Sequence, residues 1–235
     1  MESGYLLFGE RRIKEGYMKN FLRRIMPTYA WIMLIIVVSW NMFTYFGTRL
    51  FTESLYHYPV DNPIDDRIPF VPFFILFYLL AYVQWIVGFI CIARESRDVC
   101  YRVLIAEVIA KTICLLCFVF LPTTIAASRP EIESIAGKGI WCDLTALIYR
   151  LDAPNNLFPS IHCLESWICF RGAMRLKRVP RWYTPVMFVF TLLVFASTVL
   201  VKQHVWFDIL GGIAVVELGL LITKKLSLRK FIQET

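Results

Sequence analysis

The sequence is poor in the residues that mark metal sites, and it lacks the segments that mark secreted proteins. It has only three histidines in 235 residues, and none of its seven cysteines falls in the paired spacing of a zinc finger. Residues 1–27 are polar and basic, and the apolar run that follows is too long for a signal peptide, so no cleavable leader is expected. Neither an internal repeat nor a low-complexity segment is present. What stands out instead is a set of long apolar runs.

These runs predict an integral membrane protein. The chain is 58% hydrophobic, against roughly 45–50% in soluble domains, and its mean hydropathy is +0.59. The runs lie at about Thr28–Gly47, Phe70–Ile92, Val103–Leu121, Ile161–Phe170, Tyr183–Val201 and Val205–Thr223. Five approach the ~20 residues that span a bilayer, whereas the fourth does so only if it continues through Arg171 to about Leu176. Because lipid leaves no water for open backbone, we predict an all-α fold, a six-helix transmembrane bundle.

Basic residues gather in alternate loops of this six-span arrangement. They lie within residues 11–24, 94–102, 171–181 and 224–230, and the intervening loops carry few. The positive-inside rule therefore places both termini in the cytoplasm. It divides the chain into a basic N-terminus (1–27), a six-span domain (28–223) and a basic tail (224–235). The same rule accounts for the formal net charge of +7, and no soluble basic domain remains to bind nucleic acid.

The longest loop on the outer side runs from Pro122 to Pro159. Its apolar residues recur every three or four positions, at Trp141, Leu144, Leu147, Ile148 and Leu151. This spacing predicts a short outer-loop helix that either lies at the membrane interface or covers the mouth of the bundle. Cys142 and Cys163 are both expected on this side, and only geometry decides whether they can form a disulfide.

The predicted orientation brings His204 and His162 to the same outer face. His204 precedes the sixth span and lies four residues before Asp208, so the two share one face of a helix. A carboxylate on one ring nitrogen fixes the tautomer and leaves the other nitrogen free as a nucleophile. The alternative is a structural His–Asp hydrogen bond with no chemistry. The sequence alone leaves both interpretations open.

His162 follows Pro159 and Ser160, residues typical of a helix start. Free backbone N–H groups at such a start favour an anion, and the histidine beside them can act as a general acid or base. Arg129, in the outer loop, offers a planar fork that suits phosphate oxygens. Each feature alone also fits a plain capped helix or a solvated arginine.

Three short segments carry a combined signal. They are Pro122-x6-Arg129-Pro130, Pro159-Ser160-Ile161-His162 and Ser197-Thr198-x5-His204-x3-Asp208. In order and spacing they resemble the motifs Lys-x6-Arg-Pro, Pro-Ser-Gly-His and Ser-Arg-x5-His-x3-Asp of the type 2 phosphatidic acid phosphatase superfamily, the lipid phosphate phosphatases. The resemblance covers about residues 70–223. The motif forms look more like its inositol-phosphorylceramide-synthase-like phosphotransferase branch than the simple phosphatases.

The resemblance implies a membrane phosphatase or phosphotransferase that needs no metal and no cofactor. His204 would attack phosphorus and become a phosphohistidine, oriented by Asp208, while His162 protonates the leaving group and then activates the acceptor. Arg129 and Ser160 would hold the phosphate. The substrate would be a membrane lipid that carries a phosphate or diphosphate, bound at the extracytoplasmic face of a plasma or inner membrane.

Two cations of the family pattern are missing, because Pro122 and Thr198 stand where Lys and Arg are expected. A phosphoryl transition state needs positive charge around its oxygens, and Lys202 is the natural substitute. The loss leaves open a changed substrate, a cage compensated by Lys202, or a weakened enzyme. The alternatives to an enzyme are a non-catalytic lipid-phosphate binder and a small transporter of the same fold. The oligomeric state and the acceptor, water or another alcohol, are not fixed by the sequence.

Charged residues also fall inside the predicted spans. Glu107 and Lys111 lie four apart in the third span and Glu217 lies in the sixth, too far along their helices to reach the outer site. We expect these three to form a polar cluster in the inner half of the bundle. Glu165, three residues after His162, is expected either to support that histidine or to contact a neighbouring helix.

Overall fold

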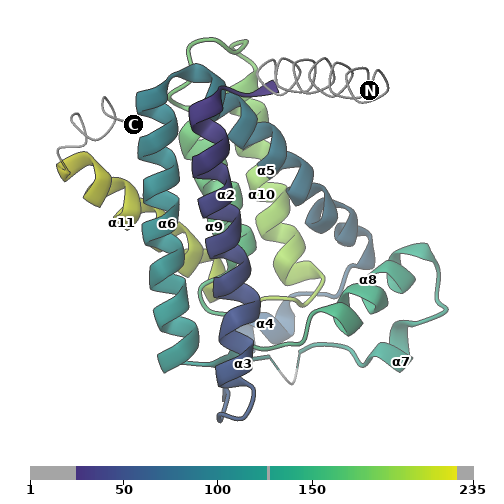
Figure 1. Ribbon diagram of the computed structural model, residues 1–235. Coiled ribbons are helices and arrows are strands. Elements are labelled where there is room, and N and C mark those ends of the chain that lie inside the picture. The colour runs from purple at the N-terminus through teal and green to yellow at the C-terminus, as the bar shows by residue number, and fades with distance from the viewer. Residues whose placement is uncertain (1–24, 126–127, 227–235) are drawn as a thin grey trace, which may run out of the picture.

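The computed structural model describes residues 25–125 and 128–226, which form a helical bundle (Figure 1). Five helical stretches are long and apolar enough to cross a membrane: Thr28–Thr52, Pro72–Glu95, Arg97–Phe120, Tyr183–Leu200 and Trp206–Lys225. They coincide with five of the six predicted runs. The prediction of a mostly helical integral membrane protein is confirmed. The predicted segment 1–24 and the end of the tail lie outside the described residues.

The first stretch is longer than its apolar run. It comprises α2 (Thr28–Met42), a π-helical turn η1 (Phe43–Gly47) and α3 (Thr48–Thr52). Thr48 bonds back to the carbonyl of Thr44 at 2.6 Å, so its hydroxyl is satisfied within the helix, and Thr44, Thr48 and Thr52 are buried. The extra turns carry Tyr45 and Arg49 to the end of the bundle where the predicted site lies.

The fourth apolar run forms α9 (Ile161–Ala173), which ends before the expected Leu176. Its 13 residues span about 20 Å, against about 30 Å of hydrocarbon. α9 packs against α5 (Ile75–Glu95), α6 (Arg97–Phe120), α10 (Tyr183–Leu200) and α11 (Trp206–Lys225). It is therefore the buried centre of the bundle, and the sixth span remains a prediction.

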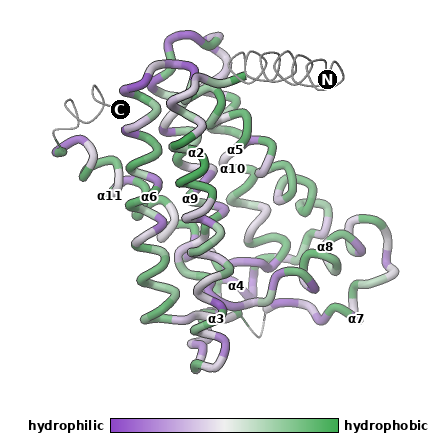
Figure 2. The backbone as a smooth tube through the Cα atoms, in the orientation of Figure 1, coloured by the Kyte–Doolittle hydropathy of each residue, from purple (hydrophilic) through white to green (hydrophobic). Residues whose placement is uncertain are grey.

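The two ends of the bundle differ in content. The start of α2 lies at the same end as the α5–α6 turn and the segment that joins α9 to α10 (Figure 1). The opposite end carries α3, α4 (Pro63–Arg67), the 3-10 turn η2 (Pro72–Phe74), α7 (Ile132–Ile135) and α8 (Ile140–Leu151). Green, hydrophobic backbone fills the long helices between these ends (Figure 2). The predicted loop helix exists as α8, and its position outside the membrane remains a prediction.

Two short strands join separate loops at the α8 end. β1 (Tyr58–Pro59) pairs in parallel with β2 (Thr123–Thr124). This pairing ties the loop after α3 to the loop after α6. Cys142 and Cys163 are both free thiols, so the structure contains no disulfide between them.

Glycines allow α11 to approach α9 closely. A Cβ on Gly212 would lie 2.9 Å from the carbonyl oxygen of Ser160 and 3.0 Å from the amide nitrogen of Leu164. Both atoms are backbone, so neither can rotate away. The missing side chain therefore lets the two helix starts, and the histidines beside them, lie together.

Replacing Gly212 with alanine should lower the free energy of unfolding by about 1–3 kcal/mol, the usual cost of overpacking. The added methyl group must push α9 away from α11. Thermal melting of the purified protein in detergent measures this. Ala214→Val adds volume to an exposed position of the same helix and should leave the melting temperature nearly unchanged; equal melting of both variants would contradict the packing argument.

The charges within the bundle pair differently from the prediction. Lys111 lies 2.5 Å from both Glu107 and Glu165, and all three side chains are buried. Glu217 contacts Arg171 at 3.0 Å and accepts a hydrogen bond from Trp167 at 2.8 Å. The Glu107–Lys111 pair is confirmed, but Glu165, and not Glu217, is its third member.

Candidate active site

Two helix starts converge at the α8 end of the bundle. Ser160 caps α9, and its hydroxyl accepts a hydrogen bond from the Cys163 amide at 3.3 Å. α11 begins after a tight turn in which Lys202 has a left-handed φ of 55°. In that turn the amides of Gln203 and His204 both donate to the carbonyl of Thr198. The turn folds His204 back over the start of α9.

His204 and Asp208 form the predicted pair. Nδ1 of His204 lies 3.0 Å from Oδ2 of Asp208, and the same oxygen accepts a hydrogen bond from the Val205 amide at 3.2 Å. Asp208 is fully buried. Because a carboxylate accepts, Nδ1 is the donor in this pair, and in the neutral ring Nε2 is then the nitrogen with the lone pair. The geometry is that required of a histidine nucleophile.

The ring of His162, on α9, packs against an aromatic wall formed by three side chains of α5. The ring stacks on Tyr78, with ring centroids 4.1 Å apart, and also contacts Tyr82 and Trp85 at 5.7 and 5.2 Å. The centroids of the His162 and His204 rings are 6.4 Å apart. Nε2 of His162 is buried without a hydrogen-bond partner. The aromatic side chains pack around the ring, and none of the described residues accepts or donates a hydrogen bond at this nitrogen.

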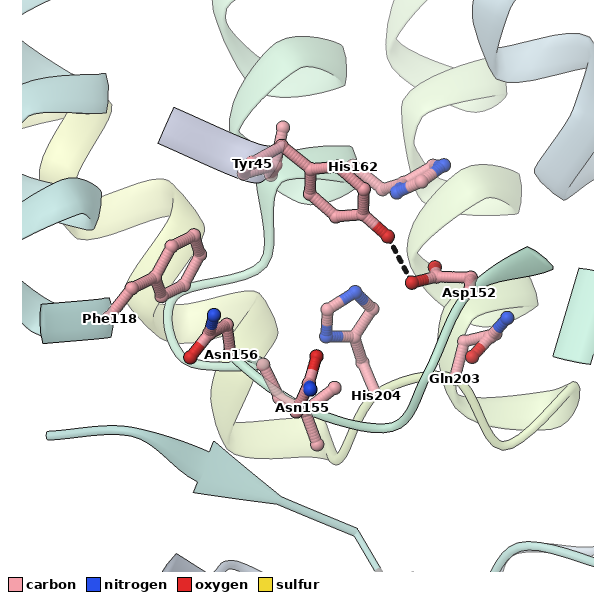
Figure 3. Close-up of a pocket in the computed structure, with 10 residues that line it drawn as sticks. Tyr45, Phe118, Asp152, Asn155, Asn156, His162, Gln203 and His204 are labelled. Carbon is pink, nitrogen blue, oxygen red and sulfur yellow. Dashed lines mark hydrogen bonds between the residues drawn. The ribbon is translucent and has the colours of Figure 1, made fainter. Parts of the chain in front are cut away.

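Both histidines line one cavity (Figure 3). Its other polar lining residues are Tyr45, Asp152, Asn155, Asn156 and Gln203. The cavity volume is about 20 Å³, which is room for about one water molecule. The hydroxyl of Tyr45 donates to the carboxylate of Asp152 beside His204 (Figure 3).

Sequence reasoning missed Tyr45, Asp152, Asn155 and Asn156. Tyr45 and Asp152 lie 107 positions apart and belong to none of the three motifs. Arg49 extends this group, since its guanidinium lies 2.9 Å from Asp152 and 3.2 Å from the amide oxygen of Asn155. No sequence signal identified them, because the periodicity of the first apolar run does not reveal the π-turn that holds Tyr45.

Arg129 lies beside the cavity without lining it. Its guanidinium donates to Gln203 and to the carbonyls of Tyr149 and Asp152, each at 3.2 Å, and stacks 3.7 Å from the Tyr149 ring. Burial lowers the pKa of Arg129 below its ordinary value, although a guanidinium stays charged in proteins. Gln203, which directly precedes His204 and lines the cavity, therefore links the predicted phosphate-binding arginine to the site.

The two other predicted phosphate ligands, Lys202 and Ser160, do not line the cavity. The ammonium of Lys202 donates to the carbonyl of Asp65 at 2.7 Å, and burial lowers its pKa. The carboxylate of Asp65 accepts a hydrogen bond from the Trp206 amide at 2.9 Å, at the start of α11. The contact of Lys202 and Ser160 with phosphate remains a prediction.

Among residues 25–125 and 128–226, no group of three or more His, Cys, Asp and Glu side chains has an arrangement that could hold a metal ion. The carboxylate that faces His204, Asp208, already pairs with the ring. The described side chains place two histidines across a narrow cavity, and one of them pairs with a carboxylate.

Comparison with known proteins agrees with this geometry. A family model, described as the PAP2 superfamily, matches residues 56–222. No curated protein and no solved structure matches the chain. The matched range contains His162, His204 and Asp208, while Tyr45 and Arg49 precede it. With about seven tenths of its length matched, the chain belongs to the PAP2 superfamily, the type 2 phosphatidic acid phosphatases and their relatives.

Proposed function

We propose that the protein removes or transfers a phosphate group of a membrane lipid phosphate or diphosphate through a phosphohistidine on His204. The observation that carries this proposal is the pair of histidine rings, 6.4 Å apart, that line one cavity, with Asp208 on the rear nitrogen of His204. A structural His–Asp bond alone gives no reason for a second, unpartnered histidine opposite.

The proposed reaction has two steps. Nε2 of His204 attacks phosphorus, the bond from phosphorus to the lipid oxygen breaks, and His162 donates a proton to that oxygen. An approaching phosphate favours the protonated form of His162, because an opposite charge stabilises the imidazolium. In the second step His162 takes a proton from water or an alcohol, whose oxygen attacks phosphorus and frees His204.

The positive charge that this reaction needs can come from two arginines near the cavity. Arg129 contacts the cavity-lining residue Gln203, and Arg49 contacts the cavity-lining residues Asp152 and Asn155. A phosphate that displaced Asp152 would leave the Arg49 fork free for its oxygens. The proposed site faces the extracytoplasmic side, because the loops at the opposite end of the bundle carry the basic clusters 94–102 and 171–181.

The experiment uses purified protein in detergent with EDTA and a panel of lipid phosphates and diphosphates labelled in the phosphate. Release of phosphate, and a protein-bound label that survives alkali but not acid, are expected of a phosphohistidine. With no release to water, alcohol acceptors are added to test transfer. Failure of both hydrolysis and transfer would support the alternative, a non-catalytic lipid-phosphate binder or transporter.

Asp152→Asn should lower KM for the lipid phosphate by about tenfold, because it removes a negative charge beside the phosphate position. Steady-state kinetics with the best substrate of the panel measures this. Glu133→Gln, which removes an exposed acid from the same loop, is the matched control and should leave KM unchanged. A higher KM in Asp152→Asn would show that the carboxylate helps to bind substrate.

A further inference from the structure

A second, larger cavity lies between α2 and α5, and neither His162 nor His204 lines it. Its volume is about 420 Å³, within the range of ligand-binding pockets. α2 packs on α6 and α5 packs on α9 and α10, and Figure 1 shows α5 diverging from α2 toward the α8 end. Exposed side chains of Val38, Met42, Tyr82 and Ile86 line the cavity. It therefore opens sideways, toward lipid.

The lining is mainly apolar, yet its floor is charged. Glu107, Lys111 and Glu165 all line the cavity, and their exposed fractions are 0, 1 and 4%. Each carboxylate uses Oε1 on Lys111, at 2.5 Å. The second oxygen, Oε2, of both Glu107 and Glu165 is buried without a hydrogen-bond partner.

Two further polar atoms of this lining are also without partners. They are Nε1 of Trp31 and Oδ1 of Asn41, both on α2. A buried polar atom without a partner costs roughly 1–3 kcal/mol. Four such atoms around one apolar cavity are a pattern expected of a site that receives polar groups from a ligand.

We propose that this lateral cavity binds an elongated apolar molecule with a hydroxyl group, which donates its one hydrogen to a free carboxylate oxygen of Glu107 or Glu165. A hydroxyl suits the site better than an ammonium does. The floor already holds its own cation in Lys111, and a second charge would be costly to bring into an apolar cavity. The ligand class is thus a long-chain alcohol or a hydroxylated lipid.

The cavity shares a wall with the candidate active site. Tyr82 and Trp85 line it and also contact the His162 ring. Glu165 lies one helical turn after His162 on α9. Binding in the cavity does not depend on phosphoryl transfer, so it can be measured whether or not the protein is an enzyme.

The test uses the full chain in lipid nanodiscs with a diazirine-bearing hexadecanol as photoprobe. Labelling should be saturable and should map to α2 and α5. Hexadecanol should compete at about a tenfold lower mole fraction than its methyl ether, which lacks the donor, because a hydrogen bond to a charged group favours binding by at least that factor. Equal competition by alcohol and ether, or labelling that does not saturate, would overturn the proposal.

Two variants locate the site. Val38→Trp fills the cavity from a half-exposed position, and Ile35→Trp adds the same side chain to an exposed position of α2 that does not line it. The first should reduce saturable labelling about tenfold and the second should not change it. Thermal melting of both variants shows that they are folded. Unchanged labelling of a folded Val38→Trp protein would place the probe elsewhere and reject the cavity.

Discussion

Replacing His204 with alanine is expected to lower phosphate release by about 10⁴-fold or more and to abolish the alkali-stable label. The substitution removes the nitrogen that forms the bond to phosphorus, and the loss of a nucleophile is rarely compensated by the remaining groups. Single-turnover assays measure the chemical step without product release. The variant should still bind the lipid, because the arginines near the cavity remain.

Two further variants serve as comparisons for His204→Ala. Asp208→Asn preserves shape but can no longer hold Nδ1–H in the same tautomer, and a similar change in a serine protease triad costs about 10⁴-fold. His57→Ala removes the third histidine, whose ring bonds only to the nearby Leu55 carbonyl among its described contacts, and should leave activity within about twofold of wild type. Full activity in His204→Ala would end the phosphohistidine proposal.

Replacing Lys111 with methionine should destabilise the protein by about 3–5 kcal/mol, because it leaves two buried carboxylates without their shared cation. Melting in detergent measures the loss. Lys138→Met, at an exposed position, should melt like the wild type. The triple variant Glu107→Gln, Lys111→Met and Glu165→Gln should regain much of the stability, since no unpaired charge remains. Unchanged melting of Lys111→Met would show that the cluster contributes no stability.

Much of the bundle follows from hydropathy alone. Five apolar runs became long helices because lipid leaves the backbone no other way to satisfy its hydrogen bonds. The first helix was underestimated, since hydropathy falls after Gly47 while the backbone continues to Thr52. The short fourth helix could not be predicted in detail, because its burial depends on its neighbours and not on its own length.

The site was predicted in part. His204 and Asp208 are four residues apart, so helical geometry alone brings them together, and the structure confirms their contact. Tyr45, Arg49 and Asp152 could not be found, because only tertiary packing brings η1, α3 and the end of α8 together. The partner of Glu165 could not be predicted for the same reason. Its spacing from His162 predicted the helix face on which it lies, but its partner Lys111 lies on another helix.

The small size of the cavity beside His204 has a consequence for turnover. Room for about one water is too small for a phosphoryl group, so the proposed reaction requires the lining to move, and the bond between Tyr45 and Asp152 is a contact in that lining that would have to open. That bond joins the first helix to the segment after α8, so the step is a relative motion of two parts of the chain. Under the proposed reaction, the frequency of this opening would set a ceiling on kcat that is independent of how fast phosphorus is attacked. Lipids with very different leaving groups would then be processed at similar maximal speeds.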